Sequence, residues 1–190
     1  MSTLNVKVII GSTRPNRFSE QAANWIFEKA KQRTTLAVEL LDLRDYPLPF
    51  FEEPLPPGLA KDGYTHPVVT RWRDKIKEAD GYIVATPEYN HGYPAVLKNA
   101  LDYTYFAWAK KAISFVSWGG LGGARSVEQL RAVAIELDMA PVRAAVHIPN
   151  FWMFLDDKGK FKSFDPYEQA GDALLDQHIW WAGALKAARQ

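Results

Sequence analysis

Short apolar runs rich in β-branched residues alternate with segments of helical periodicity along most of this 190-residue chain. The first run, residues 4–10, reads LNVKVII and ends at a glycine, as is typical of a buried strand. A polar loop follows, and from about Ser19 apolar residues recur at three- and four-residue steps, which predicts a helix. This alternation favours a parallel sheet covered on both faces, and right-handed crossovers leave few topologies for such a sheet.

The same pattern predicts the remaining elements. The predicted strands are 4–10, 36–41, 81–85, 113–118 and 141–148. The predicted helices begin at about residue 19 and then cover 67–78, 94–103, 124–137 and the tail from 165 to about 188. Five strands fit a doubly wound sheet in the order 2-1-3-4-5 better than a six-stranded dinucleotide fold. We therefore expect an α/β fold with one domain over residues 1–190.

Residues 43–63 break the pattern, because they hold five of the twelve prolines and few periodic apolar positions. We expect a long irregular loop there. Loops of that length in a compact domain are usually functional or mobile.

Charge and composition exclude several classes of protein. The chain has 23 basic and 22 acidic residues, a balance without the basic stripe of a nucleic-acid-binding protein or the polybasic segment of a membrane-surface protein. It has no cysteine, so disulfides, thiolate catalysis and cysteine-ligated metals are excluded. The four histidines show no metal-ligand spacing. With no leader pattern and no apolar run of about 20 residues, we expect a cytoplasmic protein.

Three polar or glycine-rich loops follow predicted strands one, three and four, so all three should meet at the carboxyl edge of the sheet, where such folds bind ligands. The first loop, residues 11–19, reads GSTRPNRFS and runs into a helix N-terminus. Hydroxyls, guanidiniums and free helix N–H groups are the groups that bind a phosphate. The loop is neither a Walker A motif nor a GxGxxG fingerprint. The alternative is an ordinary turn capped by Asn16 or Ser19.

The other two loops carry groups suited to a flat heterocycle. Residues 86–94 read TPEYNHGYP, with aromatic rings, an amide and two stiffening prolines. Glu88 is a possible general base there, although a loop carboxylate is more often a hydrogen-bond acceptor. Residues 118–125 read WGGLGGAR, where glycines permit close approach of the backbone to a ligand. The alternative for this loop is a flexible turn before a helix.

Together the segments GSTRPNRFS, PEYNHGYPAVLKNALDY and SWGGLGGARSVEQLR resemble the NADPH-dependent FMN reductase family of flavodoxin-like quinone, azo-compound and flavin reductases. The resemblance covers roughly residues 4–148, and PEYN with its following Pro, Lys-Asn and Asp is its most specific part. The chain departs from the family in the Pro-Asn-Arg-Phe of its first loop. Residues 149–164 match no motif of the family.

The resemblance implies a role for each loop. The FMN phosphate would be held by the first loop, through Ser12, Arg14 and Ser19, with Arg17 or Phe18 close by. The isoalloxazine would be bordered, largely through backbone groups, by Pro87, Glu88, Tyr89 and Asn90. Its other edge would be lined by Ser117, Trp118, Gly119 and Gly120.

Aromatic clusters raise the question of subunit contacts. Tyr103, Tyr105, Phe106 and Trp108 form either core or an interface, since aromatic residues are enriched at both. Related reductases are dimers, so we expect a homodimer, with a tetramer as the alternative. For residues 151–154, FWMF, an edge strand or core plug is preferred to an interface or lid.

The activity implied by the resemblance is ping-pong transfer of two electrons. NADPH or NADH would deliver hydride to FMN, and a quinone, flavin, azo compound or similar acceptor would then be reduced. The cofactor supplies the chemistry, so no catalytic side chain is required. The alternatives are a flavodoxin-type electron carrier, a non-catalytic FMN- or nucleotide-binding regulator, and a nucleotide-dependent hydrolase or transferase. The sequence does not decide between NADH and NADPH or identify the acceptor.

Overall fold

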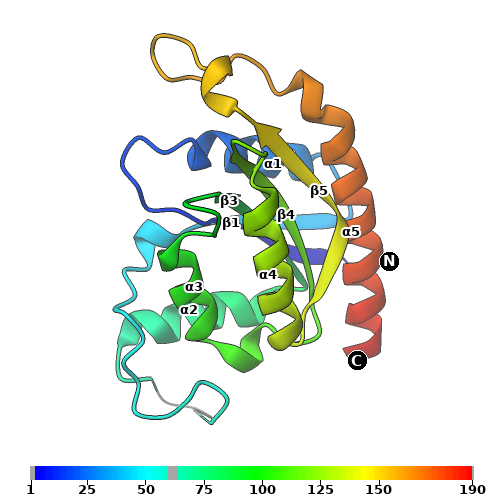
Figure 1. Cartoon of the computed structure of the whole chain (residues 1–190). Helices are drawn as coiled ribbons and strands as arrows, with labels where there is room; N and C mark the ends of the chain where they lie inside the picture. The colour runs from blue at the N-terminus through cyan, green and yellow to red at the C-terminus, as the bar shows by residue number, and fades with distance from the viewer. Residues whose placement is uncertain (1–2, 60–63, 190) are drawn as a thin grey trace.

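The computed structural model describes residues 3–59 and 64–189, and its centre is a sheet of five parallel strands (Figure 1). The strands are β1 (Leu4–Ile10), β2 (Leu36–Asp42), β3 (Gly81–Pro87), β4 (Ala112–Gly119) and β5 (Ala140–Pro149). Their order is β2-β1-β3-β4-β5. The predicted α/β fold and strand order are therefore confirmed.

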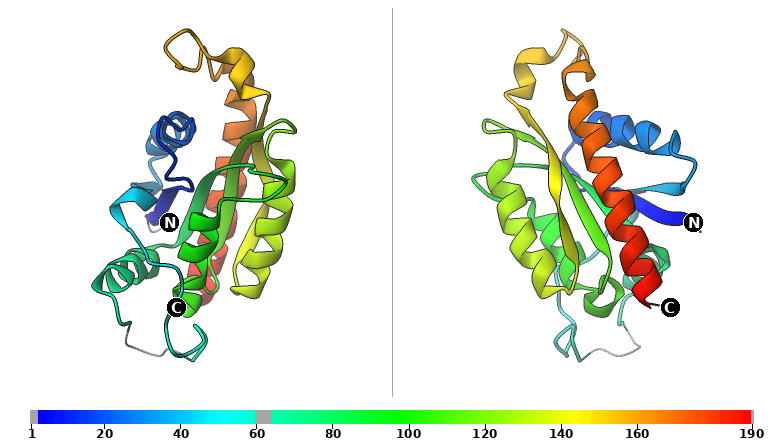
Figure 2. Two further views of the ribbon diagram at one scale, coloured as in Figure 1. Left: turned by 60° about the vertical axis from the view of Figure 1, so that its left-hand side comes forward. Right: turned by 90° about the vertical axis from the view of Figure 1, so that its right-hand side faces the viewer.

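Helices cover both faces of the sheet (Figure 2). They are α1 (Ser19–Lys31), α2 (Pro67–Glu78), α3 (Ala95–Asp102), α4 (Ala124–Glu136) and α5 (Glu168–Arg189). Apolar residues of α1 and α5 pack on one face, and those of α2, α3 and α4 pack on the other. The alternation along β1 matches this division, because Val8 and Ile10 join the first cluster and Ile9 the second.

Most predicted boundaries lie within one or two residues of the observed ones. Pro94 precedes α3 as its N-cap instead of standing inside it. Residues 43–59 are largely irregular, as expected, apart from a 3-10 turn at Leu43–Asp45, and the remainder of the predicted loop, 60–63, lies outside the described residues.

For residues 151–154 the predicted edge strand was wrong, and the predicted core plug holds for Phe151 alone. Phe151–Phe154 forms a short 3-10 helix, not an edge strand. Asn150 adopts the left-handed conformation, with φ 47°, and turns the chain out of β5. Its backbone N–H donates to the carbonyl of Gly119 at 2.9 Å. Only Phe151 packs against the core, whereas Met153 is 68% exposed.

The aromatic cluster after α3 is divided between core and surface. Tyr103 and Trp108 are buried, and the indole N–H of Trp108 donates to the carbonyl of Leu101 at 3.1 Å. Phe106 is exposed. The core interpretation therefore holds for two of these rings.

A fully buried histidine lies under the amino end of the sheet. His178, from α5, has its Nδ1 2.8 Å from the Oγ of Ser114, and its Nε2 has no hydrogen-bond partner among the described residues. A Cβ at Gly81 would lie 2.5 Å from that Nε2, so β3 must begin with glycine for α5 to pack there. Burial lowers the pKa of His178 to about 4, because a charged ring would be desolvated.

This burial predicts an acid sensitivity of the fold. The unfolded chain protonates His178 below its ordinary pKa of 6.5, while the folded chain resists protonation until about pH 4. Stability from this residue is therefore fully present above pH 6.5, decreases as the pH falls from 6.5 toward 4, and is lost once the pH falls through 4. Between pH 7.5 and 5 the loss is about 2 kcal/mol. Urea unfolding of the unaltered protein should show a fall of that size in the free energy of unfolding. The fall should disappear in His178→Gln. It should remain in the control His91→Gln, because His91 is exposed. An equal fall in all three proteins would contradict the assignment.

Candidate functional site

A cavity of about 260 Å³ lies where β1, β3 and β4 end. It is lined by Arg14, Arg17, Phe18, Ser19, Pro87, Glu88, Tyr89, Trp118, Gly119, Gly120, Phe151 and Trp152. The three predicted loops thus meet at one place. Every predicted site residue lines the cavity except Ser12, Asn90 and Ser117.

The two arginines of the first loop have different environments. Arg17 is buried, and its guanidinium bonds to the carboxylates of Glu20 and Asp42 and to the carbonyl of Ser12. Arg14 is exposed at the cavity, and its side chain has no hydrogen bond or ion pair within the described residues. Arg17 therefore shapes the loop, whereas Arg14 offers a free positive charge to a ligand.

Helix α1 points its N-terminus into the same end of the cavity. Its N-cap residue is Phe18, and no side chain caps it. The alternative in which Asn16 or Ser19 caps an ordinary turn was therefore wrong. The first N–H groups of a helix lack intrahelical acceptors and carry a partial positive charge, so this end of the cavity is suited to an anion.

Ser12 lies just behind the lining and connects the first loop to the third-strand loop. Its hydroxyl is buried and lies 2.9 Å from the hydroxyl of Tyr89. It also accepts a long bond of 3.4 Å from the backbone N–H of Arg14. Ser12 thus positions both Tyr89 and the turn that carries Arg14.

The first turn of α4 holds the loop after β3 in place. Arg125 donates from Nε to Oε1 of Glu88 at 2.6 Å and from its backbone N–H to Oε2 at 3.2 Å. The Glu88 side chain is only 5% exposed and forms an ion pair with Arg125, so removal of Arg125 would leave a buried carboxylate without its cation. The same guanidinium lies 2.9 Å from Nε2 of His91. Ser126 donates to the carbonyl of Pro87 and Gln129 to that of His91. Glu88 therefore accepts hydrogen bonds, as the sequence favoured, rather than standing free as a base.

Ser117 does not reach the cavity, because its hydroxyl is used inside the glycine-rich loop. It donates to the carbonyl of Gly122 at 2.7 Å and lies 2.9 Å from Nδ1 of His147. Gly123 has φ 78°, and a Cβ there would lie 2.6 Å from the Cβ of Ser117. The flexible-turn alternative is thus replaced by a tightly packed turn that brings Gly119 and Gly120 to the cavity.

Of the remaining predicted residues, Trp118 lies in the wall of the cavity and Asn90 lies on the surface of the protein. Trp118 is buried and meets Phe18 edge-on, with ring centroids 5.4 Å apart. Asn90 is exposed in the left-handed conformation, φ 49°, at the tip of its loop. Phe151 and Trp152 line the cavity although they were not predicted as site residues. The available signal was their position directly after the fifth parallel strand, which ends at the same edge.

The two ends of the cavity differ in chemistry. One end offers a guanidinium, the Ser19 hydroxyl and a helix N-terminus, and the other offers proline and glycine backbone beside aromatic rings. This donor set fits a molecule with an anionic tail and a flat ring system, as FMN has. No cluster of three metal-ligating side chains occurs within residues 3–59 and 64–189.

Comparison with known families decides the assignment. The sequence profile of the NADPH-dependent FMN reductases matches residues 4–153. The chain belongs to this family. The resemblance seen in the three loops is therefore confirmed, and with it the assignment as an oxidoreductase of a family named for FMN and NADPH.

Individual relatives agree with the assignment to this family, and a solved structure agrees with the fold. The chain is 41% identical over 150 residues to an NAD(P)H-dependent FMN reductase of Schizosaccharomyces pombe, covering 78% of this chain and 75% of the relative. It is 33% identical over 193 residues to a quinone reductase of Pseudomonas putida, covering 96% and 97%. The fold matches FerB, a flavoenzyme NAD(P)H:(acceptor) oxidoreductase of Paracoccus denitrificans, with a TM-score of 0.73, 20% identity, and coverage of 96% and 98%.

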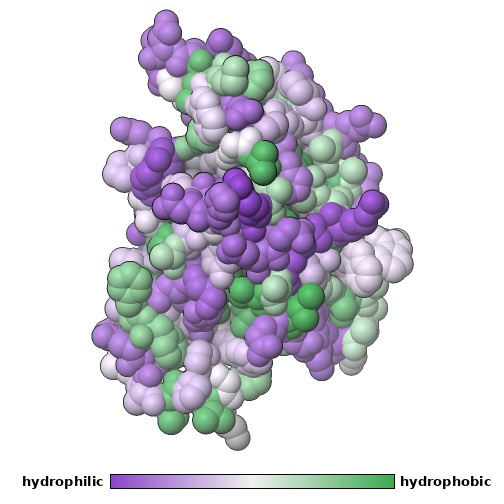
Figure 3. Space-filling model, viewed as in Figure 1, coloured by the Kyte–Doolittle hydropathy of each residue, from purple (hydrophilic) through white to green (hydrophobic). Residues whose placement is uncertain are grey.

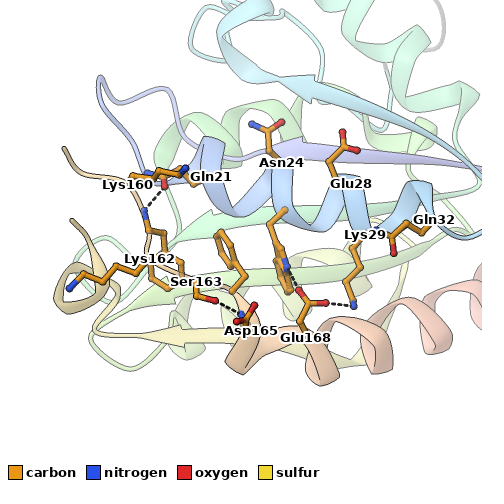
Figure 4. Close-up of a pocket in the computed structure, with 13 residues that line it drawn as sticks. Gln21, Asn24, Glu28, Lys29, Gln32, Lys160, Lys162, Ser163, Asp165 and Glu168 are labelled. Carbon is orange, nitrogen blue, oxygen red and sulfur yellow. Dashed lines mark hydrogen bonds and ion pairs between the residues drawn. The ribbon is translucent and has the colours of Figure 1, made fainter. Parts of the chain in front are cut away.

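A second hollow, of about 620 Å³, lies between α1 and residues 160–168 (Figure 4). Three of its polar side chains pair with one another: Glu168 accepts from the indole N–H of Trp25 at 2.6 Å and from Lys29. Because none of its lining residues belongs to the three loops that follow β1, β3 and β4, we place the functional site at the smaller cavity.

The Glu88–Arg125 pair yields a second prediction. Arg125→Met leaves the Glu88 carboxylate buried without its partner, so the free energy of unfolding should fall by about 2 kcal/mol. Urea unfolding measures this loss. In the double variant Glu88→Gln/Arg125→Met the unpaired charge is gone, and most of the stability should return. A double variant less stable than Arg125→Met alone would contradict the pairing argument.

Proposed function

We propose that this chain is an FMN-dependent NAD(P)H oxidoreductase that passes two electrons to a small-molecule acceptor such as a quinone, a flavin or an azo compound. The observation that carries the proposal is the Arg14 guanidinium, which has no partner in the described part of the chain, beside the uncapped N-terminus of α1. Proline, glycine and tryptophan line the rest of the same cavity. Membership of the family supports it.

Each end of the cavity has its own task in this proposal. Arg14, Ser19 and the N–H groups of α1 would bind the FMN phosphate, while Ser12 and Arg17 keep the loop in shape. Pro87, Glu88 and Tyr89 would border the ring on one side, and Trp118, Gly119 and Gly120 on the other. Asn90 and Ser117 stay predictions as contacts of the ring, and Ser12 stays a prediction as a contact of the phosphate. Bound FMN would supply the two-electron chemistry.

The protein's own contribution is position and exclusion of water. The Ser12–Tyr89 and Glu88–Arg125 contacts fix two loops relative to each other, so a ring between them keeps one orientation. Because one cavity would serve donor and acceptor in turn, we expect ping-pong kinetics.

A flavodoxin-type carrier is the second candidate, since it shares the fold. Such carriers are strongly acidic, whereas this chain has a net charge of +1, which favours an enzyme. No helix in the described ranges is long and apolar enough to cross a bilayer. One domain over residues 1–190, a homodimer and a cytoplasmic location stay predictions.

Two measurements test the function. The purified protein should show flavin absorbance, or acquire it with FMN, and heat should release FMN. It should also oxidise NADPH or NADH at steady state with 2-methyl-1,4-naphthoquinone. Bound FMN without turnover would support a carrier or regulator instead, and a protein that takes up no FMN would defeat the proposal.

Arg14 provides a sharper test. Arg14→Ala removes a charge-assisted contact to phosphate, so the Kd for FMN should rise about tenfold or more. The KM for NADPH should change less. Quenching of FMN fluorescence measures the Kd, and Arg73→Ala, on the distant α2, is the matched control. Equal losses for FMN and NADPH would contradict the assignment of Arg14 to the phosphate.

A further inference from the structure

The segment that follows β5 places an aromatic ring at the mouth of the cavity, outside the three loops that carry the family resemblance. We propose that this ring, Trp152, is the residue that recognises the electron acceptor and favours planar conjugated carbonyl compounds. The inference rests on the proposed function and adds a specificity-determining residue to it.

Trp152 is attached to a firmly held turn. The Asn150 N–H bonds to the Gly119 carbonyl at 2.9 Å, and the Met153 N–H bonds to the Asn150 carbonyl at 2.9 Å. Phe151 stacks on Phe18, with ring centroids 4.7 Å apart and an interplanar angle of 22°. The turn is thus fixed both to the glycine-rich loop and to the start of α1.

The segment beyond this turn is held as well. The Gln21 side chain donates to the carbonyl of Gly159 at 2.8 Å and accepts from the N–H of Phe161 at 2.7 Å. The Phe161 ring lies 5.0 Å from that of Phe18. Because both sides of Phe151–Phe154 are anchored, Trp152 has a defined place at the cavity.

Only part of the Trp152 ring is used within the chain. One edge meets Phe151, at 5.4 Å between centroids and an angle of 73°, and the ring tip lies 3.9 Å from the Cβ position of Gly120. The side chain is half-exposed, and its indole N–H has no acceptor among the described residues. Apolar surface lies over this segment at the top of the molecule in Figure 3, above a hydrophilic band.

A free indole face with a free N–H specifies a class of ligand. The face stacks on a planar conjugated ring, and the N–H donates to a carbonyl oxygen at the ring's edge. Quinones and other cyclic enones have both features. A non-planar acceptor such as ferricyanide has neither, so Trp152 should discriminate between the two kinds of acceptor.

The test compares kcat/KM for 2-methyl-1,4-naphthoquinone with kcat/KM for ferricyanide. In a ping-pong mechanism these constants report the acceptor step alone. Trp152→Ala should lower the quinone-to-ferricyanide ratio about tenfold, and Trp152→Phe, which keeps the stacking face but not the N–H, about threefold. Met153→Ala is the matched control, because Met153 is an exposed neighbour outside the cavity lining, and its ratio should stay within twofold.

Three outcomes would overturn the proposal. An unchanged ratio in Trp152→Ala means that the ring does not select the acceptor. A ratio that falls together with FMN affinity assigns Trp152 to the cofactor instead. Equal losses in Trp152→Ala and Met153→Ala, with a change in size-exclusion volume, assign the segment to a contact between copies. Failure of the proposed function is distinguishable, because the unaltered protein would then turn over neither acceptor.

Discussion

All five strands run parallel, so every loop that follows a strand leaves the sheet at the same edge. This constraint explains why segments far apart in the sequence, at residues 11–19, 87–91, 118–125 and 150–154, surround one cavity. The crossover helices cover the two faces, and ligands of such sheets bind at the carboxyl edge of the strands. The position of the site is therefore a consequence of topology, and the loops decide its chemistry.

The elements were predictable because the strands are buried. β3 and β4 are covered on both faces, so continuous apolar runs located them and the order of the sheet followed from the connections.

The roles of individual side chains were not predictable, since they depend on partners distant in sequence. Arg14 and Arg17 look alike in the sequence, and what separates them is the set of partners that Arg17 has, among them the distant Asp42. The contact of Ser117 with His147 could not be foreseen for the same reason, because His147 lies on the next strand. Phe151–Phe154 has strand-like composition, and a single left-handed residue turns it into a 3-10 helix.

Polar groups around the cavity fall into two kinds. Arg17, Glu88 and Ser117 are buried and bonded to their own chain, and they set the shape of the loops. Arg14, the first N–H groups of α1 and the Trp152 indole lack partners in the described part of the chain, and they face the space that a ligand would fill. The arrangement is preorganised, since the groups left free are carried by segments that are themselves held.

The packing of α1 against the C-terminal segment of the chain has a consequence for folding during translation. The N-cap Phe18 and the α1 residues Ala22 and Ile26 are buried in one cluster with Phe161, Leu174 and Leu175. Lys29 pairs with Glu168. During synthesis from the N-terminus, α1, which follows the first loop, emerges from the ribosome long before these partners. Its apolar stripe then stays exposed to water and to chaperones until α5 has been translated. A chain truncated before α5 would leave that stripe available for aggregation.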